Sequence, residues 1–400
     1  MKIALVSEHA SPLAVVGGVD AGGQNVHVAA LATELTRLGH AVTVFTRRDD
    51  PQAPAQVNAP DGYVVEHVPA GPPTEVPKDE LLPHMVSFSR YLADRWVLEP
   101  PDVIHAHFWM SGLAAMPAAA RVGVPVLQTF HALGTVKRRH QGVRDTSPQI
   151  RISAETSLCR SVDHVIATCV DEVRELRAMG MPPGRATVVP CGVDLDLFRP
   201  GPAPRNQRRR LLTVGRLVER KGVADVVQAL AELPDVKLLV AGGPAADALS
   251  LDPEVGRLQA LAERIGVAQR VRFLGRVEHA RMPELFRRCD VVVAVPWYEP
   301  FGIVPLEAMA CSRPVVGSAV GGLLDTVVPG VTGELVPPRR PDLLATVLGD
   351  LLADPTRGER YGAAGRARVR RLYSWQRVAA DTEQVYARVA ERAQMRMEAG

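Results

Sequence analysis

The chain has 400 residues, of which 46% are hydrophobic and 23% are charged, and its formal net charge is only +3. This composition is that of a globular protein, and so small a charge gives no indication of nucleic acid or a membrane surface as a partner. Because the chain is too long for one hydrophobic core, two domains are predicted.

The cysteines and the start of the chain bear on its compartment. The residues Met1 to Glu8 reach charged side chains too early for a signal peptide, and no apolar run approaches the roughly 18 residues of a spanning helix. The cysteines are odd in number and lack C-x-x-C spacing, which predicts buried thiols in a reducing compartment: Cys159, Cys169, Cys191, Cys289 and Cys311. We therefore expect a cytoplasmic protein without a transmembrane segment.

Strands and helices alternate through the first half of the chain. A strand over Ile3–Ser7 leads into a glycine-rich loop, Gly17–Gln24, and then into a helix over Asn25–Leu38 that ends at Gly39. Further strands are predicted over Ala41–Phe45, Val64–Val68, Val103–His107, Val124–Thr129, Val165–Thr168 and Thr187–Val189. Helices are predicted over Leu81–Trp96, Gly112–Arg121, Ile150–Ser161 and Val170–Met179.

A segment rich in proline and glycine, Cys191–Pro204, predicts an exposed linker. We interpret the run Arg208–Arg210 after it as solvated charge rather than a phosphate patch. The next strands are predicted over Leu211–Gly215, Lys237–Ala241, Val271–Leu274, Val291–Val295, Pro314–Gly317 and Gly333–Val336. The matching helices are predicted over Val223–Leu233, Glu254–Ile265, Pro283–Arg288, Ile303–Cys311, Leu323–Val328, Pro341–Ala353, Gly358–Leu372 and Trp375–Met395.

Alternating strands and helices build parallel sheets with helices on both faces. The predicted fold is therefore α/β, with a first Rossmann-like domain over residues 1–194 and a second over residues 195–372. The surplus helix in residues 373–400 is expected to cross back and pack on the first domain. Such sheets bind ligands beyond the carboxyl ends of their strands, which predicts a central cleft faced by both domains.

The most informative segment is the strand–loop–helix sequence from Glu299 to Glu307. One carboxylate lies in the loop and the other in the second helical turn, with Phe301 and Gly302 between them. Helical side chains lean toward the N-terminus, so both carboxylates can face one site, and the backbone N–H groups at the helix start favour an anion there. Acceptors for sugar hydroxyls beside donors for a phosphate suit a nucleotide-sugar.

Other loops at strand ends complete the predicted site. Arg216 and Lys221, at a strand-to-helix turn, can hold a diphosphate by fork geometry and point charge, although two basic loop residues are common in isolation. Gly22 and Gly23 allow backbone to approach a phosphate or sugar closely. Three further candidate residues follow predicted strands. His131 is one, and Arg276 and Val277 lie in a loop that could hold the base of a nucleotide.

Two patterns that suggest metal binding are better explained otherwise. Asp194 and Asp196 form a D-x-D, but they lie in the linker among glycine and proline. His105 and His107 share one face of a strand, yet no third ligand is visible near them, and zinc sites use three or four. No metal or other cofactor is expected.

Taken together, these motifs resemble glycosyltransferase family 4, the retaining enzymes of the GT-B fold. The first half is similar to the mycothiol-pathway inositol-phosphate N-acetylglucosaminyltransferases and, through Gly22-Gly23-Gln24, to sucrose and sucrose-phosphate synthases. The similarity to the mycothiol-pathway enzymes lies in Ser11–Leu13, Asp20–Val26, Ile104–Trp109 and Val136–Lys137.

The resemblance implies roles for the candidate residues on the donor side. Gly23, Arg216 and Lys221 would meet the diphosphate, and Glu307 would hold the ribose. Glu299, Phe301, Gly302 and Ile303 would hold the donor sugar, and His131 would contact that sugar near the reacting carbon. The donor implied is a nucleotide-sugar, taken as a UDP-sugar.

On the acceptor side the sequence departs from the mycothiol pattern. Lys78 and Arg151 stand where the two basic residues would be, and Asn25 in the glycine-rich motif and Phe108 are further predicted acceptor contacts. Phe108 replaces a tyrosine and Ala132 a threonine, so two hydroxyl donors are missing. A cyclitol, a sugar or a small thiol is therefore as open an acceptor as inositol phosphate.

The predicted reaction is metal-independent sugar transfer with retention. Charge on the departing diphosphate would be stabilised by Arg216, Lys221 and the helix start at Gly302, and no carboxylate is placed as a covalent nucleophile. Two alternatives remain: a GT-B nucleotide-sugar epimerase, and a non-catalytic sugar-binding protein on the same scaffold. The sequence also leaves a homodimer open.

Overall fold

The computed structural model describes residues 1–14, 22–202 and 209–399. The chain forms two compact units, and each is considered by itself. The first consists of Met1–Pro190 together with Trp375–Gly400, and the second of Cys191–Ser374. The predicted loop residues Gly17–Ala21, the linker residues Ala203 and Pro204, and Arg208 lie outside the described residues.

The first unit is built on one sheet with the strand order β3-β4-β2-β1-β5-β6-β7-β8. All neighbouring strands run parallel except the edge pair β3 and β4, which is antiparallel. The strands are β1 (Lys2–Val6), β2 (Ala41–Arg47), β3 (Gln56–Asn58), β4 (Val64–Val68), β5 (Val103–His107), β6 (Val126–Thr129), β7 (His164–Ala167) and β8 (Ala186–Val188).

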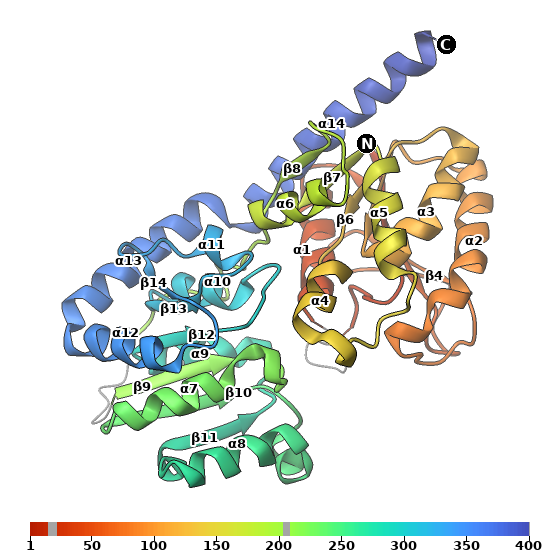
Figure 1. The fold of residues 1–400 in the computed structure, drawn as a ribbon. Coiled ribbons are helices and arrows are strands. Elements are labelled where there is room, and N and C mark those ends of the chain that lie inside the picture. Colours follow the sequence, from red (N-terminus) through yellow and green to blue (C-terminus); the bar gives the residue numbers. More distant parts are fainter. Residues whose placement is uncertain (15–21, 203–208, 400) are drawn as a thin grey trace. The chain divides into compact units, whose positions relative to one another are not determined.

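Helices cover both faces of this sheet, with α2 and α3 side by side on one face and α1 with α14 on the other (Figure 1). The core on the α2–α3 side includes the fully buried rings of Phe88, Trp96 and Trp109. The helices are α1 (Gly23–Arg37), α2 (Met85–Leu98), α3 (Trp109–Val122), α4 (Gly134–Gln141), α5 (Arg151–Ser161), α6 (Val170–Ala178) and α14 (Trp375–Ala399).

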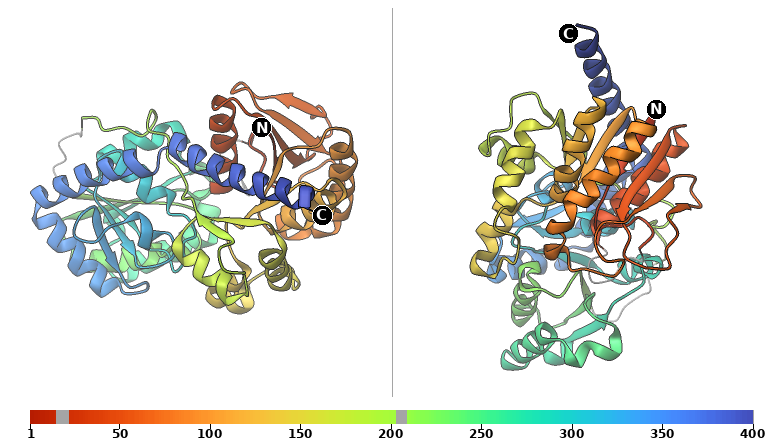
Figure 2. Two further views of the ribbon diagram at one scale, coloured as in Figure 1. Left: turned by 90° about the horizontal axis from the view of Figure 1, so that it is seen from above. Right: turned by 90° about the vertical axis from the view of Figure 1, so that its right-hand side faces the viewer.

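Helix α14 belongs to the first unit although it follows the second in the chain (Figure 2). Its apolar stripe, Val378, Val385 and Val389, is buried, and the helix packs on α1. The hydroxyl of Tyr386 lies 2.7 Å from Nδ1 of His105 in the sheet. The helix is therefore an integral layer of this unit.

The second unit has a fully parallel sheet with the order β11-β10-β9-β12-β13-β14. One apolar cluster joins this sheet to α7, α8 and α12, and another joins it to α9, α10 and α13. The strands are β9 (Arg209–Val214), β10 (Val236–Ala241), β11 (Val271–Gly275), β12 (Val291–Ala294), β13 (Val315–Ser318) and β14 (Gly333–Val336). The helices are α7 (Val223–Ala229), α8 (Pro253–Arg264), α9 (Met282–Arg288), α10 (Ile303–Ala310), α11 (Leu323–Thr326), α12 (Pro341–Ala353) and α13 (Pro355–Leu372).

Each sheet contains one point at which the strand order reverses. In the first unit the chain proceeds outward from β1 and then resumes on its other side at β5, and in the second it does the same at β9 and β12. The loops after two such strands diverge, and ligands bind in the crevice between them. The fold therefore marks one candidate crevice in each unit.

The α/β prediction is confirmed, with element ends shifted by a few residues. Two elements were missed, for physical reasons. Strand β3 is a three-residue edge segment without an apolar pattern. Helix α4 has a single large apolar residue, Val136, and so lacks an apolar stripe. The predicted helix over Val223–Leu233 is α-helical only to Ala229 and continues as a 3₁₀ turn.

Replacing Tyr386 with Phe tests how α14 is held to the first unit. The ring would keep its place, but Nδ1 of the fully buried His105 would lose its partner. We expect the free energy of unfolding to fall by about 1–3 kcal/mol, measured by urea titration followed by circular dichroism. Arg388→Ala on the exposed side of α14 should change it by less than about 0.5 kcal/mol, and equal losses in the two variants would contradict this role.

Candidate active site

The loop after β9 is fixed against the end of β12. It passes through a 3₁₀ turn, Glu219–Lys221, and ends at Gly222, whose φ is +71°. A Cβ at Gly222 would lie 2.0 Å from the carbonyl oxygen of Val295. Only glycine satisfies both the left-handed backbone and this close approach, so the residue type holds two site loops together.

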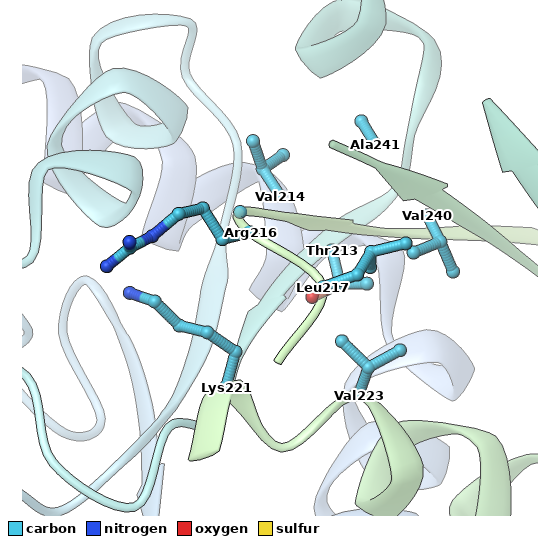
Figure 3. A pocket seen from close by; sticks show the side chains of 9 residues that line it. Thr213, Val214, Arg216, Leu217, Lys221, Val223, Val240 and Ala241 are labelled. Carbon is cyan, nitrogen blue, oxygen red and sulfur yellow. The ribbon is translucent and has the colours of Figure 1, made fainter. Parts of the chain in front are cut away.

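Arg216 and Lys221 extend from this loop toward the same region (Figure 3). They line a small pocket at the carboxyl end of β9, opposite the apolar residues Leu217, Val223 and Val240. The pocket thus has a cationic side and an apolar side. The structure brings together the two basic residues that the sequence predicted for this site.

Lys221 is paired with Glu299, the loop carboxylate of the predicted two-glutamate motif. Its Nζ lies 2.5 Å from Oε2 of Glu299, and both side chains are mostly shielded from solvent. Burial by itself would raise the pKa of Glu299, but the Lys221 ammonium and the Phe301 backbone N–H lower it below its ordinary value. Glu299 is therefore held as a carboxylate beside the cationic side of the pocket.

Helix α10 begins next to this ion pair. Gly302 stands before its first residue with a φ of +78°, and Ile303 opens the helix, as predicted. The backbone N–H groups of a first helical turn have no carbonyl partner within the helix, and they carry the positive end of its dipole. The arrangement is chemically suited to an anion beside Lys221.

Glu307 lies further along α10 and is buried. Its Oε1 is 3.1 Å from Nε2 of His279, which lies beyond the end of β11. Burial raises the pKa of Glu307, with His279 acting in the opposite direction, and the bond to Glu307 raises the pKa of His279. Sequence reasoning missed His279, because a single histidine in a polar loop carries no pattern that points to a glutamate 28 residues later.

The same loop contains Arg276 and Val277, predicted to lie near a base. The backbone N–H of Arg276 donates to the carbonyl of Pro244 at 2.8 Å, and Val277 packs on the apolar cluster that includes α10. The loop that contains Arg276 and Val277 therefore packs on the second unit, which also contains Glu307.

In the first unit the start of α1 lies after the glycine-rich loop. Asn25, predicted to contact an acceptor, is buried and accepts from the backbone N–H of Gly22 at 2.9 Å. Its amide nitrogen donates to the carbonyl of Ser11 at 2.9 Å. In this structure Asn25 thus secures the start of the helix, where Gly23 is the first residue.

Four buried histidines form a cluster between β5, β6 and α1. Nδ1 of His107 lies 2.9 Å from Nε2 of His131, and the His27 ring is 5.2 Å from that of His131. Burial lowers the pKa of His27 to about 4 and that of His105 to about 3, so these rings are neutral. His131 has a φ of +61°, a strained value for this residue type that a surrounding structure must impose.

The structure also brings together three of the predicted acceptor residues. Two cations lie over the Phe108 ring, with Nζ of Lys78 at 5.7 Å and Cζ of Arg151 at 5.1 Å from its centroid. Arg151 is buried, with its Nε 2.7 Å from Glu155 and its Nη2 donating to the carbonyl of Ala132 at 2.7 Å. These contacts form a cationic cluster around an aromatic ring at the carboxyl ends of β5 and β6.

The suspected metal ligands have other contacts. Both ring nitrogens of His105 are engaged, by Tyr386 and by Thr129 at 2.8 Å. Oδ1 of Asp194 accepts from the backbone N–H groups of Asp196 and Leu197, which closes a turn. Across the described ranges, no group of three or more histidine, cysteine or acidic side chains is arranged to hold a metal ion.

Two further predictions concern the described residues as a whole. All five cysteines are buried free thiols. Outside residues 15–21, 203–208 and 400, which are not described, no helix has the length and apolar character to cross a bilayer.

Two Rossmann-like units with loops of this kind at their strand ends define a GT-B glycosyltransferase. Residues 21–197 match the sequence family described as Glycosyltransferase Family 4, and residues 196–368 match the one described as Glycosyl transferases group 1. The chain is 37% identical to the D-inositol 3-phosphate glycosyltransferase of Xylanimonas cellulosilytica, over 98% of this chain and 97% of the relative. The chain belongs to glycosyltransferase family 4.

Other relatives and solved structures agree with this assignment. The D-inositol 3-phosphate glycosyltransferase of Streptomyces scabiei is 35% identical, with 96% of this chain and 90% of the relative covered. The solved sucrose-phosphate synthase from Thermosynechococcus elongatus is 34% identical and superposes with a TM-score of 0.88, covering 97% of this chain and 99% of the other. Both resemblances drawn from the sequence are thereby confirmed.

Gly222→Ala tests the close approach of the two site loops. The new methyl group would meet Val295 in a left-handed backbone, whereas at Gly266 the φ is +74° and nothing lies within 4 Å. Gly266→Ala should cost about 1–2 kcal/mol for its backbone alone. Gly222→Ala should cost about 1–3 kcal/mol more and reduce activity, as measured by urea unfolding and turnover. Equal effects in the two variants would show that the contact with Val295 does not matter.

Proposed function

We propose that the protein is a retaining glycosyltransferase that moves a hexose-type sugar from a UDP-sugar to a small polar, phosphorylated acceptor in the cytoplasm. The observation that carries this proposal is the Lys221–Glu299 pair, 2.5 Å apart, next to Arg216 and the start of α10. A diphosphate and a sugar need such a neighbouring set of donors and acceptors.

On the donor side, Arg216 and Lys221 bind the diphosphate, and Lys221 is positioned for this by Glu299. The backbone N–H groups at Gly302 and Ile303 add further donors, while Phe301 donates to Glu299, whose carboxylate also accepts from sugar hydroxyls. Glu307 accepts from the ribose, while the loop containing Arg276 and Val277 holds the base.

The transfer proceeds on one face of the sugar. The bond between the anomeric carbon and the diphosphate oxygen breaks as the acceptor oxygen bonds to that carbon, and the acceptor proton passes to the departing phosphate. Negative charge grows on the diphosphate in this step, and Arg216, Lys221 and the helix start stabilise it. No covalent intermediate on a protein carboxylate is required.

The cluster around Phe108 supports an acceptor that carries a phosphate. Arg151 is matched by Glu155 at 2.7 Å, and Lys78 adds a second positive charge near the Phe108 ring. The curated relatives are named D-inositol 3-phosphate glycosyltransferases. Phe108 offers no hydroxyl, so the acceptor would be gripped by charge and by ring contact, which suits a phosphorylated cyclitol or sugar.

Arg216→Ala and Lys221→Ala test the donor site. Each removes a charge-assisted contact to the leaving group, and we expect turnover to fall by about 10- to 100-fold with the fold intact. A panel of nucleotide-sugars and candidate acceptors, read by mass spectrometry, first identifies the substrates, and steady-state kinetics then measures the loss. Lys237→Ala, at an exposed lysine of β10 in the same unit, serves as the control. Near-normal turnover in both site variants at saturating donor would refute the assignment.

Lys78→Ala tests the acceptor site separately. Loss of the ammonium over Phe108 should raise the KM for a phosphorylated acceptor about tenfold or more while the donor KM stays within about twofold. Lys2→Ala, at the amino end of β1 and half-exposed, should change neither constant. An unchanged acceptor KM in Lys78→Ala would show that no acceptor anion binds at this cluster.

A further inference from the structure

His279 and Glu307 make a contact that the proposed reaction does not yet use. His279 opens a 3₁₀ turn, His279–Arg281, in the segment that follows β11, and Glu307 projects from α10. Their side chains meet at 3.1 Å, between Nε2 and Oε1. The Glu307 side chain is 9% exposed and the His279 side chain 33% exposed, so the contact is largely shielded from water.

The His279 ring is held in place on its other side. Phe198, which is fully buried, meets it edge to face with the ring centroids 5.1 Å apart. Phe198 is itself fixed by the turn that Asp194 closes, because its backbone N–H donates to the Asp194 carbonyl at 2.9 Å. The imidazole thus lies between a rigid aromatic ring and the Glu307 carboxylate.

This contact leaves the two carboxylate oxygens of Glu307 in different situations. Oε1 is taken by His279, whereas Oε2 accepts no hydrogen bond from any residue that the structure describes. A carboxylate held at one oxygen cannot rotate freely, so the other oxygen is offered in one direction. Hydroxyl groups that donate to it are then recognised at a fixed position.

We propose that His279 is a positioning residue that orients Glu307 to accept from the ribose hydroxyls of the donor nucleotide. This inference rests on the proposed function, in which Glu307 meets the ribose. The bond from His279 also opposes the effect of burial, which raises the pKa of Glu307, and so favours the ionised, purely accepting form. His279 acts through Glu307 and touches no reacting atom.

Two variants separate orientation from structure. His279→Phe keeps a ring against Phe198 and removes the donor to Glu307, whereas His279→Gln keeps an N–H that can reach the carboxylate. Calorimetry of the full chain measures the affinity for UDP and for 2′-deoxy- and 3′-deoxy-UDP. The ratio of each deoxy Kd to the UDP Kd reports ribose recognition alone.

In the unsubstituted protein at least one ratio should be about tenfold, the size of one well-made hydrogen bond. His279→Phe should reduce it to about twofold or less, and His279→Gln should restore most of it. Inorganic pyrophosphate, which probes Arg216 and Lys221 without a ribose, should bind all three proteins equally. Weaker pyrophosphate binding in His279→Phe would indicate a general structural defect and overturn the positioning role.

The remaining outcomes separate the two proposals. An unaltered deoxy ratio in His279→Phe, with UDP still bound, would overturn the positioning role and leave the glycosyltransferase assignment intact. Failure of the unsubstituted protein to bind UDP would remove the UDP-sugar donor, and the role of His279 with it.

Discussion

Parallel strand order is the constraint on which both candidate sites depend. A parallel sheet brings all its carboxyl ends to one edge, and a reversal of strand order separates two neighbouring loops at that edge. In the second unit β9 and β12 flank the reversal, and their loops carry Lys221 and Glu299. In the first unit β1 and β5 flank it, and Phe108 follows β5 directly. Residues far apart in the chain become neighbours because parallel pairing places the loops that follow neighbouring strands at the same edge of the sheet.

In each unit, shielded acidic side chains are paired with a basic side chain. Glu299 has Lys221, Glu307 has His279, and Glu155 has Arg151. An unpaired carboxylate in such surroundings would take up a proton, so each partner preserves an acceptor where a hydroxyl-rich ligand would need one. The two glutamates of the second unit nevertheless differ, because a fixed ammonium lowers the pKa of Glu299 while that of Glu307 stays raised. The two carboxylates of this unit therefore lie in opposite electrostatic surroundings.

The sequence predicted the parts of this protein that repeat a local pattern. Apolar runs located every strand of the second sheet, and glycine at Gly302 marked the start of α10. Contacts between distant loops could not be predicted from the sequence, because no residue pattern near His279 indicates that its ring contacts Glu307 and Phe198. Part of the histidine cluster could be predicted, because His105 and His107 alternate along one strand. His27 and Tyr386 could not, because they come from helices whose packing is determined only by the tertiary structure. For Asn25 the motif suggested a ligand contact, and the fold adds a contact at the helix start that the motif did not indicate.

The place of α14 in the chain has a consequence for biosynthesis. The first unit needs this helix to cover His105 and α1, yet the ribosome makes all of Cys191–Ser374 before it. Domains generally fold during synthesis as soon as their residues emerge. The nascent first unit must therefore wait, with one side of its core uncovered, until the second unit has been translated. A chain interrupted after residue 374 would leave a complete second unit attached to an unfinished first one, a species that quality-control proteases and chaperones could distinguish from the finished enzyme.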